Sequence, residues 1–123
     1  MLLIEDDQKV SLSTVLLLES WGCIVSSAKS AEEALQIVKV NKNLADVIIA
    51  DFRLPGNING TETITLIENV TGRIIPAIIV TGETNIDEVR NLCNFRFEVL
   101  RKPIKPAKLR RLINNCLTLP LTV

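Results

Sequence analysis

The 123 residues of the chain fit one compact domain, residues 1–123, and leave little room for a second. Hydrophobic residues make up 47% and charged residues 23%, as in ordinary globular proteins, which excludes a long disordered tail. Lysine plus arginine equals aspartate plus glutamate at 14 each, so the overall charge selects neither a nucleic acid nor an anionic membrane as partner.

Short apolar runs alternate with segments of helical periodicity in the first half of the chain. Residues 2–4 predict a buried strand, and residues 8–21 predict a helix because apolar side chains recur at helical spacing. A second strand is predicted over residues 23–27, and a second helix begins at an S-x-x-E capping pattern, residues 30–33. Residues 46–51 are an apolar, β-branched run that ends in an acid, which is typical of a central strand. The predicted apolar face of the first helix comprises Val10, Leu12, Val15, Leu16, Leu17, Leu18 and Trp21.

The second half of the chain continues the same alternation. Its predicted elements are a loop over residues 54–60, a helix over 61–70, a strand over 74–80, a helix over 84–93, a strand over 97–100 and a helix from 106 to 117. In the helix over residues 61–70, Ile64, Leu66 and Ile67 are expected to face inward. The result is five strand–helix units, which predicts an α/β fold with a doubly wound parallel sheet and right-handed crossovers.

Polar residues stand where four of the predicted strands end. The first strand runs into Glu5-Asp6-Asp7, the third ends in Asp51, the fourth in Thr81-Gly82, and the fifth leads into Lys102. Ligands of open parallel sheets bind beyond the carboxyl ends of the strands. Since the first and third strands are expected to be neighbours, their acids should meet in one cleft.

Carboxylates this close repel one another, and a bound divalent cation removes the conflict. Ligation by oxygen alone favours Mg²⁺, Mn²⁺ or Ca²⁺ over zinc, and few protein carboxylates with open water positions favour Mg²⁺. A nucleophilic carboxylate at Asp51, beside a cation, the Lys102 ammonium and the Thr81 hydroxyl, is suited to phosphoryl transfer.

Each of these residues also has a purely structural interpretation. An acid at a strand end is usually a solvated turn or a helix cap, and for Asp7 capping of the first helix is favoured over a metal role. Thr81 beside Gly82 suits a turn, and a lysine before proline is most often a surface residue. The order acid, acid, hydroxyl, lysine at four successive strand ends favours the functional interpretation.

The ordered set of motifs resembles response-regulator receiver domains of two-component systems over essentially the whole chain. It consists of Leu3-Ile4-Glu5-Asp6-Asp7, Asp51-Phe52-Arg53-Leu54-Pro55-Gly56 with Asn59-Gly60, Ile79-Val80-Thr81-Gly82 and Lys102-Pro103. The spacings are 45 residues from Asp6 to Asp51, 30 from Asp51 to Thr81 and 21 from Thr81 to Lys102. The resemblance implies a flavodoxin-like (βα)5 sandwich with strand order 2-1-3-4-5. Relative to the family, the loop from Leu54 to Gly60 looks one residue longer.

The resemblance also implies a phosphorylated aspartate with a Mg²⁺ site, Mn²⁺ being the alternative ion. Asp51 matches the aspartate that takes a phosphoryl group from a phosphohistidine partner. Asp6 matches a direct metal ligand, Glu5 a contact through water, and Arg53 the position whose backbone carbonyl is a ligand.

Further roles are implied for the other motif residues. Thr81 matches the switch hydroxyl, and Lys102 matches the family lysine, with a cis bond to Pro103. The family usually has Tyr or Phe three residues before this lysine, where this chain has Val99. Phe97 lies two residues earlier and should point to the same face of the strand. This departure does not argue against phosphorylation. It does argue against the family's usual readout, in which an aromatic side chain at this position changes rotamer.

A histidine kinase or a histidine-phosphotransfer domain is the implied partner, and it must supply the histidine, since this sequence has none. Three segments resemble the C-terminal receivers of hybrid sensor histidine kinases: Asp51-Phe52-Arg53-Leu54-Pro55-Gly56, Thr81-Gly82-Glu83-Thr84 and Pro106-Ala107-Lys108-Leu109. The family's output face is the helix over 84–93, the strand over 97–100 and the last helix, which is also the candidate surface of a homodimer. On this chain it includes Arg90, Phe95, Phe97, Val99, Arg101 and Arg110.

Two other functions remain open. One is a degenerate receiver that only binds proteins. The other is an enzyme, such as a phosphatase of the haloacid dehalogenase type. That family's D-x-D signature needs an acid two residues after the nucleophile, and this chain has Arg53 there, which argues against this function.

The domain is also expected to catalyse its own phosphorylation and dephosphorylation. DNA binding within this chain is not expected, because no basic recognition helix is present.

Compartment and chain ends are inferred from simple features. The cysteines Cys23, Cys93 and Cys116 form no CxxC pair, which argues against a disulfide framework or a zinc site and favours a reducing cytosol. No apolar run approaches the roughly 20 residues that span a bilayer. A cytoplasmic location is expected, including the cytoplasmic part of a membrane-bound sensor. Because the first strand begins at Leu2, the domain is expected to be cut from a longer polypeptide.

Overall fold

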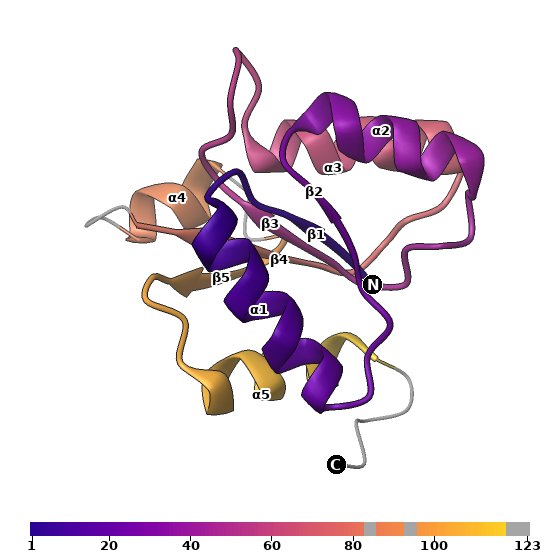
Figure 1. Ribbon diagram of the computed structural model, residues 1–123. Helices are drawn as coiled ribbons and strands as arrows, with labels where there is room; N and C mark the ends of the chain where they lie inside the picture. The colour runs from indigo at the N-terminus through magenta and orange to yellow at the C-terminus, as the bar shows by residue number, and fades with distance from the viewer. Residues whose placement is uncertain (83–85, 93–95, 118–123) are drawn as a thin grey trace.

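A five-stranded parallel sheet with helices on both faces forms the domain in the computed structural model, which describes residues 1–82, 86–92 and 96–117 (Figure 1). The strand order is β2-β1-β3-β4-β5 and every pairing is parallel, so the predicted flavodoxin-like topology is confirmed. The strands are β1 (Leu2–Ile4), β2 (Ser26–Ala28), β3 (Ile48–Asp51), β4 (Ala77–Thr81) and β5 (Glu98–Arg101).

Helices cover the sheet on both sides (Figure 1). One face carries α1 (Gln8–Ser20) and α5 (Pro106–Cys116), the other carries α2 (Ala31–Val40) and α3 (Gly60–Thr71), and α4 (Ile86–Leu92) lies beside β5. The carboxyl ends of β1, β3, β4 and β5 reach one edge of the sheet, next to the start of α1. Within the described residues, no helix combines the length and the apolar character that crossing a bilayer requires.

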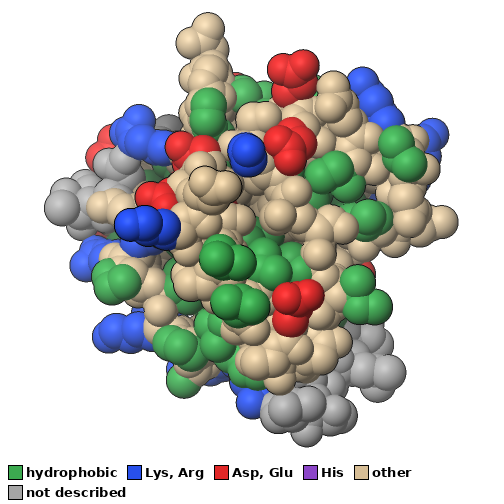
Figure 2. Space-filling view, in the orientation of Figure 1, with side chains coloured by type: hydrophobic (Ala, Val, Ile, Leu, Met, Phe, Trp, Pro, Cys, Tyr) green, Lys and Arg blue, Asp and Glu red, His purple; other side chains and the backbone are tan. Residues whose placement is uncertain are grey.

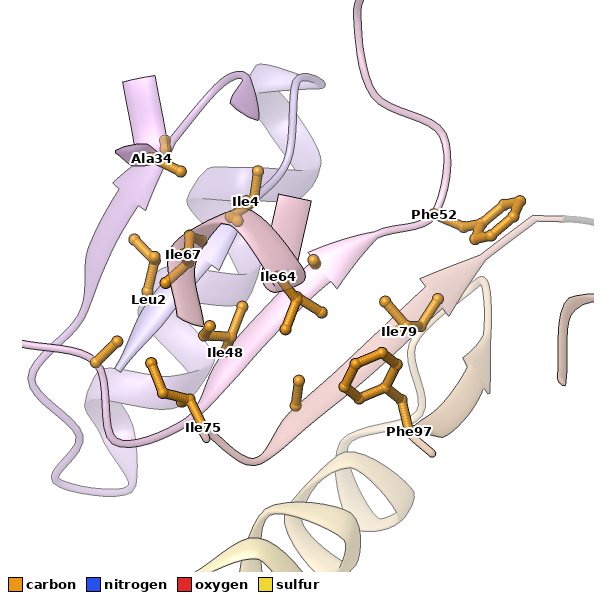
Figure 3. Close-up of a cluster of buried hydrophobic side chains, with 14 of the residues drawn as sticks. Leu2, Ile4, Ala34, Ile48, Phe52, Ile64, Ile67, Ile75, Ile79 and Phe97 are labelled. Atoms are coloured by element: carbon orange, nitrogen blue, oxygen red, sulfur yellow. The ribbon is translucent and has the colours of Figure 1, made fainter. Parts of the chain in front are cut away.

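Alternating strand residues build two cores, one on each face of the sheet. Ile4, Ile48 and Ile79 belong to the cluster under α2 and α3, and Figure 3 shows their side chains gathered with Ile64 and Ile67 of α3. The intervening residues pack against α1 and α5, among them Leu3, Ile49, Ile78 and Val80. This two-residue period explains why every strand of the sheet centre is apolar on both sides.

Side-chain caps fix where three of the helices begin. The Asp7 carboxylate accepts hydrogen bonds from the backbone N–H groups of Lys9 and Val10, so the predicted capping role of Asp7 is confirmed. Ser30 caps α2 by accepting from the Glu33 N–H. Asn59 and Glu62 form a reciprocal capping box at the start of α3.

Two strands begin three residues later than the apolar pattern suggested, and β3 begins two residues later, at Ile48 instead of residue 46. Strand β2 starts at Ser26 instead of residue 23, and β4 starts at Ala77 instead of residue 74, because the parallel register pairs Ser26 with Leu2 and Ala77 with Ile48. The residues left outside the ladder include Ile24 and Ile74, whose side chains are 88% and 80% exposed. The runs of apolar β-branched residues are thus longer than the segments that form hydrogen bonds with the neighbouring strand.

Smaller differences concern helix faces and ends. The prediction that Leu12, Leu16 and Leu66 face the core was wrong, since all three are exposed. In α1 the buried positions are Leu18 and Thr14, whose hydroxyl donates to the Val10 carbonyl and so needs no water. Strand β5 begins one residue later than predicted and α3 one residue earlier. The predicted cap of α4 over residues 84–85, and Cys93, lie outside the described residues; Cys23 and Cys116 are free thiols.

Candidate functional site

Three carboxylates from two neighbouring strands meet at the carboxyl edge of the sheet. Glu5 and Asp6 directly follow β1, and Asp51 is the last residue of β3, which pairs with β1. One carboxylate oxygen from each residue lies within 4.8 Å of the other two. Figure 2 shows acidic and basic side chains side by side in the upper part of the view, over this edge. The expected convergence of the two acidic loops is therefore present in the fold.

Lys102 joins two of these carboxylates. Its Nζ atom donates to Glu5 Oε1 at 2.8 Å and to Asp51 Oδ2 at 2.9 Å. Burial opposes the charged form of the lysine, but the hydrogen bonds to Glu5 and Asp51 and their negative charges outweigh it and raise the pKa of the Lys102 ammonium above its ordinary value. Lys102 is therefore positively charged throughout the neutral pH range. The predicted cis peptide bond between Lys102 and Pro103 is confirmed.

The charges of this group do not balance. Three carboxylates face one ammonium, so among these four side chains the negative charges exceed the positive by two. The Glu5 side chain is 5% exposed and that of Asp51 11%, so water screens their repulsion only in part. A divalent cation would balance the excess, and carboxylate oxygens are the ligands that Mg²⁺, Mn²⁺ and Ca²⁺ prefer.

The two acids after β1 are bonded differently. Glu5 is occupied at both oxygens, because Oε1 accepts from Lys102 and Oε2 accepts from the Asp7 N–H at 3.3 Å. The Asp6 side chain is exposed, and within the described part of the chain no hydrogen bond to its carboxylate is present. Asp6 can therefore turn its oxygens to a cation without breaking a hydrogen bond, whereas Glu5 would have to give up one of its two.

The backbone around Asp51 is held from two sides. The N–H of Phe52 donates to the Val80 carbonyl of β4 at 2.8 Å, and the N–H of Gly60 donates to the Phe52 carbonyl, also at 2.8 Å. Gly60 lies against the Asp51 peptide so closely that a Cβ there would collide with the Asp51 backbone oxygen and lie 3.4 Å from Ile79 Cδ1. Sequence reasoning treated Gly60 only as part of a loop motif and missed this contact. The signal available was a glycine following asparagine at the start of α3.

Thr81 ends β4 next to Asp51. Its side chain is 1% exposed, and its carbonyl accepts the backbone N–H of Lys102 at 2.8 Å. Asp51 pairs with Val80, the residue before Thr81, so the backbones of Asp51, Thr81 and Lys102 are linked across three adjacent strands. Thr81 has an interaction partner in the structure.

The other residues singled out in the sequence lie around this edge. Arg53 forms an isolated antiparallel bridge with Asn59, which fixes its backbone two residues after Asp51, while its side chain is exposed. Phe97 and Val99 are buried in the same core cluster, as the strand alternation predicted. The guanidinium of Arg110 lies 5.7 Å from the Trp21 ring, so this residue packs beside the end of α1 rather than on the predicted output face. Phe95 lies outside the described residues.

A family model described as the response regulator receiver domain matches residues 1–114 of the chain. Among curated proteins, the chain is 30% identical over 119 residues to the transcriptional regulatory protein ZraR of Klebsiella oxytoca, covering 94% of the chain but 26% of ZraR. The match therefore concerns about a quarter of that regulator.

Solved structures give the same result for the fold. A response regulator receiver domain protein from Clostridium thermocellum is 33% identical, with a TM-score of 0.79 over 94% of this chain and 90% of that chain. The receiver domain of the hybrid histidine kinase CckA is 26% identical, with a TM-score of 0.78 over 95% of this chain and 97% of that chain.

Proposed function

The chain belongs to the response regulator receiver domain family of two-component signalling, and on that premise we propose that Asp51 is its phosphoryl acceptor. The observation that supports this most directly is the meeting of Glu5, Asp6 and Asp51 at one edge of the sheet, with the Lys102 ammonium 2.9 Å from Asp51 Oδ2. Such an arrangement suits a carboxylate nucleophile that meets a phosphate group.

The proposed reaction is a displacement at phosphorus. An oxygen of the Asp51 carboxylate forms a bond to the phosphorus of a phosphohistidine, the phosphorus–nitrogen bond breaks, and its electron pair stays on the imidazole of the partner. The product is an acyl phosphate on Asp51. Lys102, already hydrogen-bonded to Asp51, is placed to pair with the oxygens of the arriving group, and the Thr81 hydroxyl is proposed as a second donor.

The carboxylate cluster fits a Mg²⁺ ion, with Mn²⁺ as an alternative. We assign Asp6 and Asp51 as direct ligands, Glu5 as a contact through water, and the Arg53 carbonyl as a backbone ligand. A bound Mg²⁺ supplies positive charge that neutralises the carboxylates and the phosphoryl oxygens. The engagement of Glu5 by Lys102 and by the Asp7 N–H supports the division of roles between Glu5 and Asp6.

The partner must carry the histidine that gives up the phosphoryl group, so a histidine kinase or a histidine-phosphotransfer domain is proposed, in the cytoplasm. The consequence of phosphorylation is a change in partner affinity, with Thr81, Phe97 and Val99 as the switch region. Phe97 and Val99 are buried, so any readout through them proceeds by repacking of the core rather than by a ring swinging between solvent and core.

Wild-type protein treated with acetyl phosphate and Mg²⁺ is expected to gain the mass of one phosphoryl group. The reason is that a small acyl phosphate can reach the exposed edge where Asp6 and Asp51 lie. Intact mass spectrometry measures the gain, and a parallel sample with excess EDTA should show none. A protein that never gains this mass would be a degenerate receiver that acts only by binding, and rapid turnover of small phosphate esters would indicate a phosphatase instead.

Lys102→Ala is expected to leave Mg²⁺ binding largely intact and to weaken the structural change that follows phosphorylation. The metal-binding carboxylates remain in this variant, whereas the cation beside Asp51 is lost. Mg²⁺ affinity by calorimetry and amide hydrogen exchange before and after phosphorylation separate the two effects. An unchanged exchange response to phosphorylation would contradict the role given to Lys102.

A further inference from the structure

Asn59 joins the start of α3 to the part of the chain that follows Asp51. It forms an isolated antiparallel bridge with Arg53, and the next residue, Gly60, donates its N–H to the Phe52 carbonyl at 2.8 Å. The connection from β3 to α3 therefore rises above the sheet edge and returns against its own first residues, as the loop between these two elements in Figure 1 shows. The backbone of residues 52 and 53 is thus held by the residues that begin α3.

The Asn59 side chain fixes the first turn of α3. Its Oδ1 atom accepts from the Glu62 N–H at 3.0 Å and from the Thr61 hydroxyl at 2.6 Å. In return, the Glu62 carboxylate accepts the Asn59 N–H at 3.1 Å, and the Asn59 carbonyl accepts from the N–H and the hydroxyl of Thr63. Because these bonds satisfy groups that the start of a helix otherwise leaves unpaired, they set the direction in which the chain enters α3.

The backbone held in this way belongs to residues that the proposed cation site uses. A carboxylate can be turned toward a cation by a change of rotamer, but the direction of the Arg53 carbonyl depends on the backbone alone. The Arg53 side chain is exposed, so its burial does little to fix that backbone, and the bridge to Asn59 is a main constraint. Gly60 lies directly against the Asp51 peptide, so a shift in the first turn of α3 also reaches Asp51 by contact.

We propose that Asn59 is a positioning residue for the cation site. Its cap on α3 holds the chain at residues 52 and 53, which aims the Arg53 carbonyl and fixes the end of β3 at Asp51. The inference rests on the proposed function, because the cation is the one assigned there. The competing role is a cap that only stabilises α3, and the two roles differ in their effect on Mg²⁺ affinity.

Calorimetric titration of the unphosphorylated full chain with Mg²⁺ tests the proposal, with amide hydrogen exchange of the metal-free protein as a second measurement. Asn59→Ala removes the cap and is expected to weaken Mg²⁺ binding by about tenfold, as loss of a group that orients a metal ligand does. In the metal-free variant, the Gly60 N–H that bonds to the Phe52 carbonyl should exchange faster than in the wild type. Asn59→Ser introduces an uncharged residue that caps a helix about as well as asparagine, so it should keep both values near those of the wild type.

Ser30→Ala is the matched control. It removes the side-chain cap of another helix, α2, where the Ser30 hydroxyl accepts the Glu33 N–H at 3.2 Å. Loss of this cap should lower the midpoint of thermal unfolding much as Asn59→Ala does. Its Mg²⁺ affinity should nevertheless stay within about twofold of the wild-type value, because the Ser30 cap lies outside the bonds that hold residues 52 and 53.

Wild-type Mg²⁺ affinity in Asn59→Ala would overturn the proposal. An equal loss of affinity in Ser30→Ala would overturn it as well, since the effect would then follow from stability alone, and so would Mg²⁺ binding in Asn59→Ser as weak as in Asn59→Ala. Each of these results removes the role of Asn59 and leaves the cation site standing. Wild-type protein that binds no Mg²⁺ would instead overturn the cation site of the proposed function, and this proposal with it.

Discussion

Asp51→Asn is expected to abolish the mass gain from acetyl phosphate and Mg²⁺. The amide has nearly the shape of the carboxylate but lacks the charge and the nucleophilic oxygen that the proposed acyl phosphate requires. Lys102 keeps its 2.8 Å hydrogen bond to Glu5, and one carboxylate is removed from a crowded group. The fold should therefore persist, with the free energy of unfolding within about 1 kcal/mol of wild type.

Asp7→Asn is the matched control for this experiment. It makes the same chemical change two residues after Glu5, at a side chain that caps α1, and asparagine caps a helix about as well as aspartate. This variant should take up one phosphoryl group like the wild type. Phosphorylation of the Asp51→Asn protein to the wild-type level would contradict the assignment of Asp51.

Gly60→Ala is expected to displace Asp51 and to destabilise the domain. A methyl group at this position would collide with the Asp51 backbone oxygen, so either the Gly60–Phe52 hydrogen bond or the end of β3 must shift. Forcing an extra methyl group into a packed contact costs about 1–3 kcal/mol, although alanine would otherwise favour the helix. Because phosphoryl transfer depends on sub-ångström placement of the nucleophile, uptake at Asp51 should slow by about tenfold or more.

Gly82→Ala provides the control for stability. Among the residues that the structure describes, no atom lies within 4 Å of a Cβ at Gly82, so the free energy of unfolding, measured by urea denaturation, should stay close to wild type. A Gly60→Ala protein that was as stable and as rapidly phosphorylated as the wild type would contradict the proposal that the close approach of Gly60 positions Asp51.

The topology was predictable because its signals are periodic. Strand runs that are apolar on every residue, such as Ile48-Ile49-Ala50, require a sheet that is covered on both faces, and helical spacing between them requires crossovers. Strand ends were less predictable. Ile24 and Ile74 look like strand residues, yet pairing begins after them because the register is set by Leu2 and Ile48 on the neighbouring strands.

The outline of the site was predictable for a related reason. Parallel strands finish at one edge, so acids after β1 and at the end of β3 had to meet, and a lysine after β5 could reach them. The individual bonds were not predictable. That Lys102 bridges Glu5 and Asp51, or that Gly60 packs on the Asp51 peptide, depends on rotamers and on the approach of α3, which sequence spacing does not encode.

The long-range ion pair between Arg96 and Glu68 was also beyond sequence reasoning. Glu68 is buried in α3, accepts the N–H of Ile75 at 2.9 Å and pairs with Arg96, whose guanidinium lies 4.5 Å from the Phe97 ring. These groups tie α3 to the segment before β5.

Anomalous diffraction from crystals grown with Mn²⁺ locates the cation itself, and so shows whether Glu5, Asp6 and Asp51 form one cation site. One strong manganese peak is expected in contact with the carboxylates of Asp6 and Asp51, close to Glu5. A protein whose crystals contained no manganese at this edge, or held it only elsewhere on the surface, would contradict the claim that these three acids form one cation site.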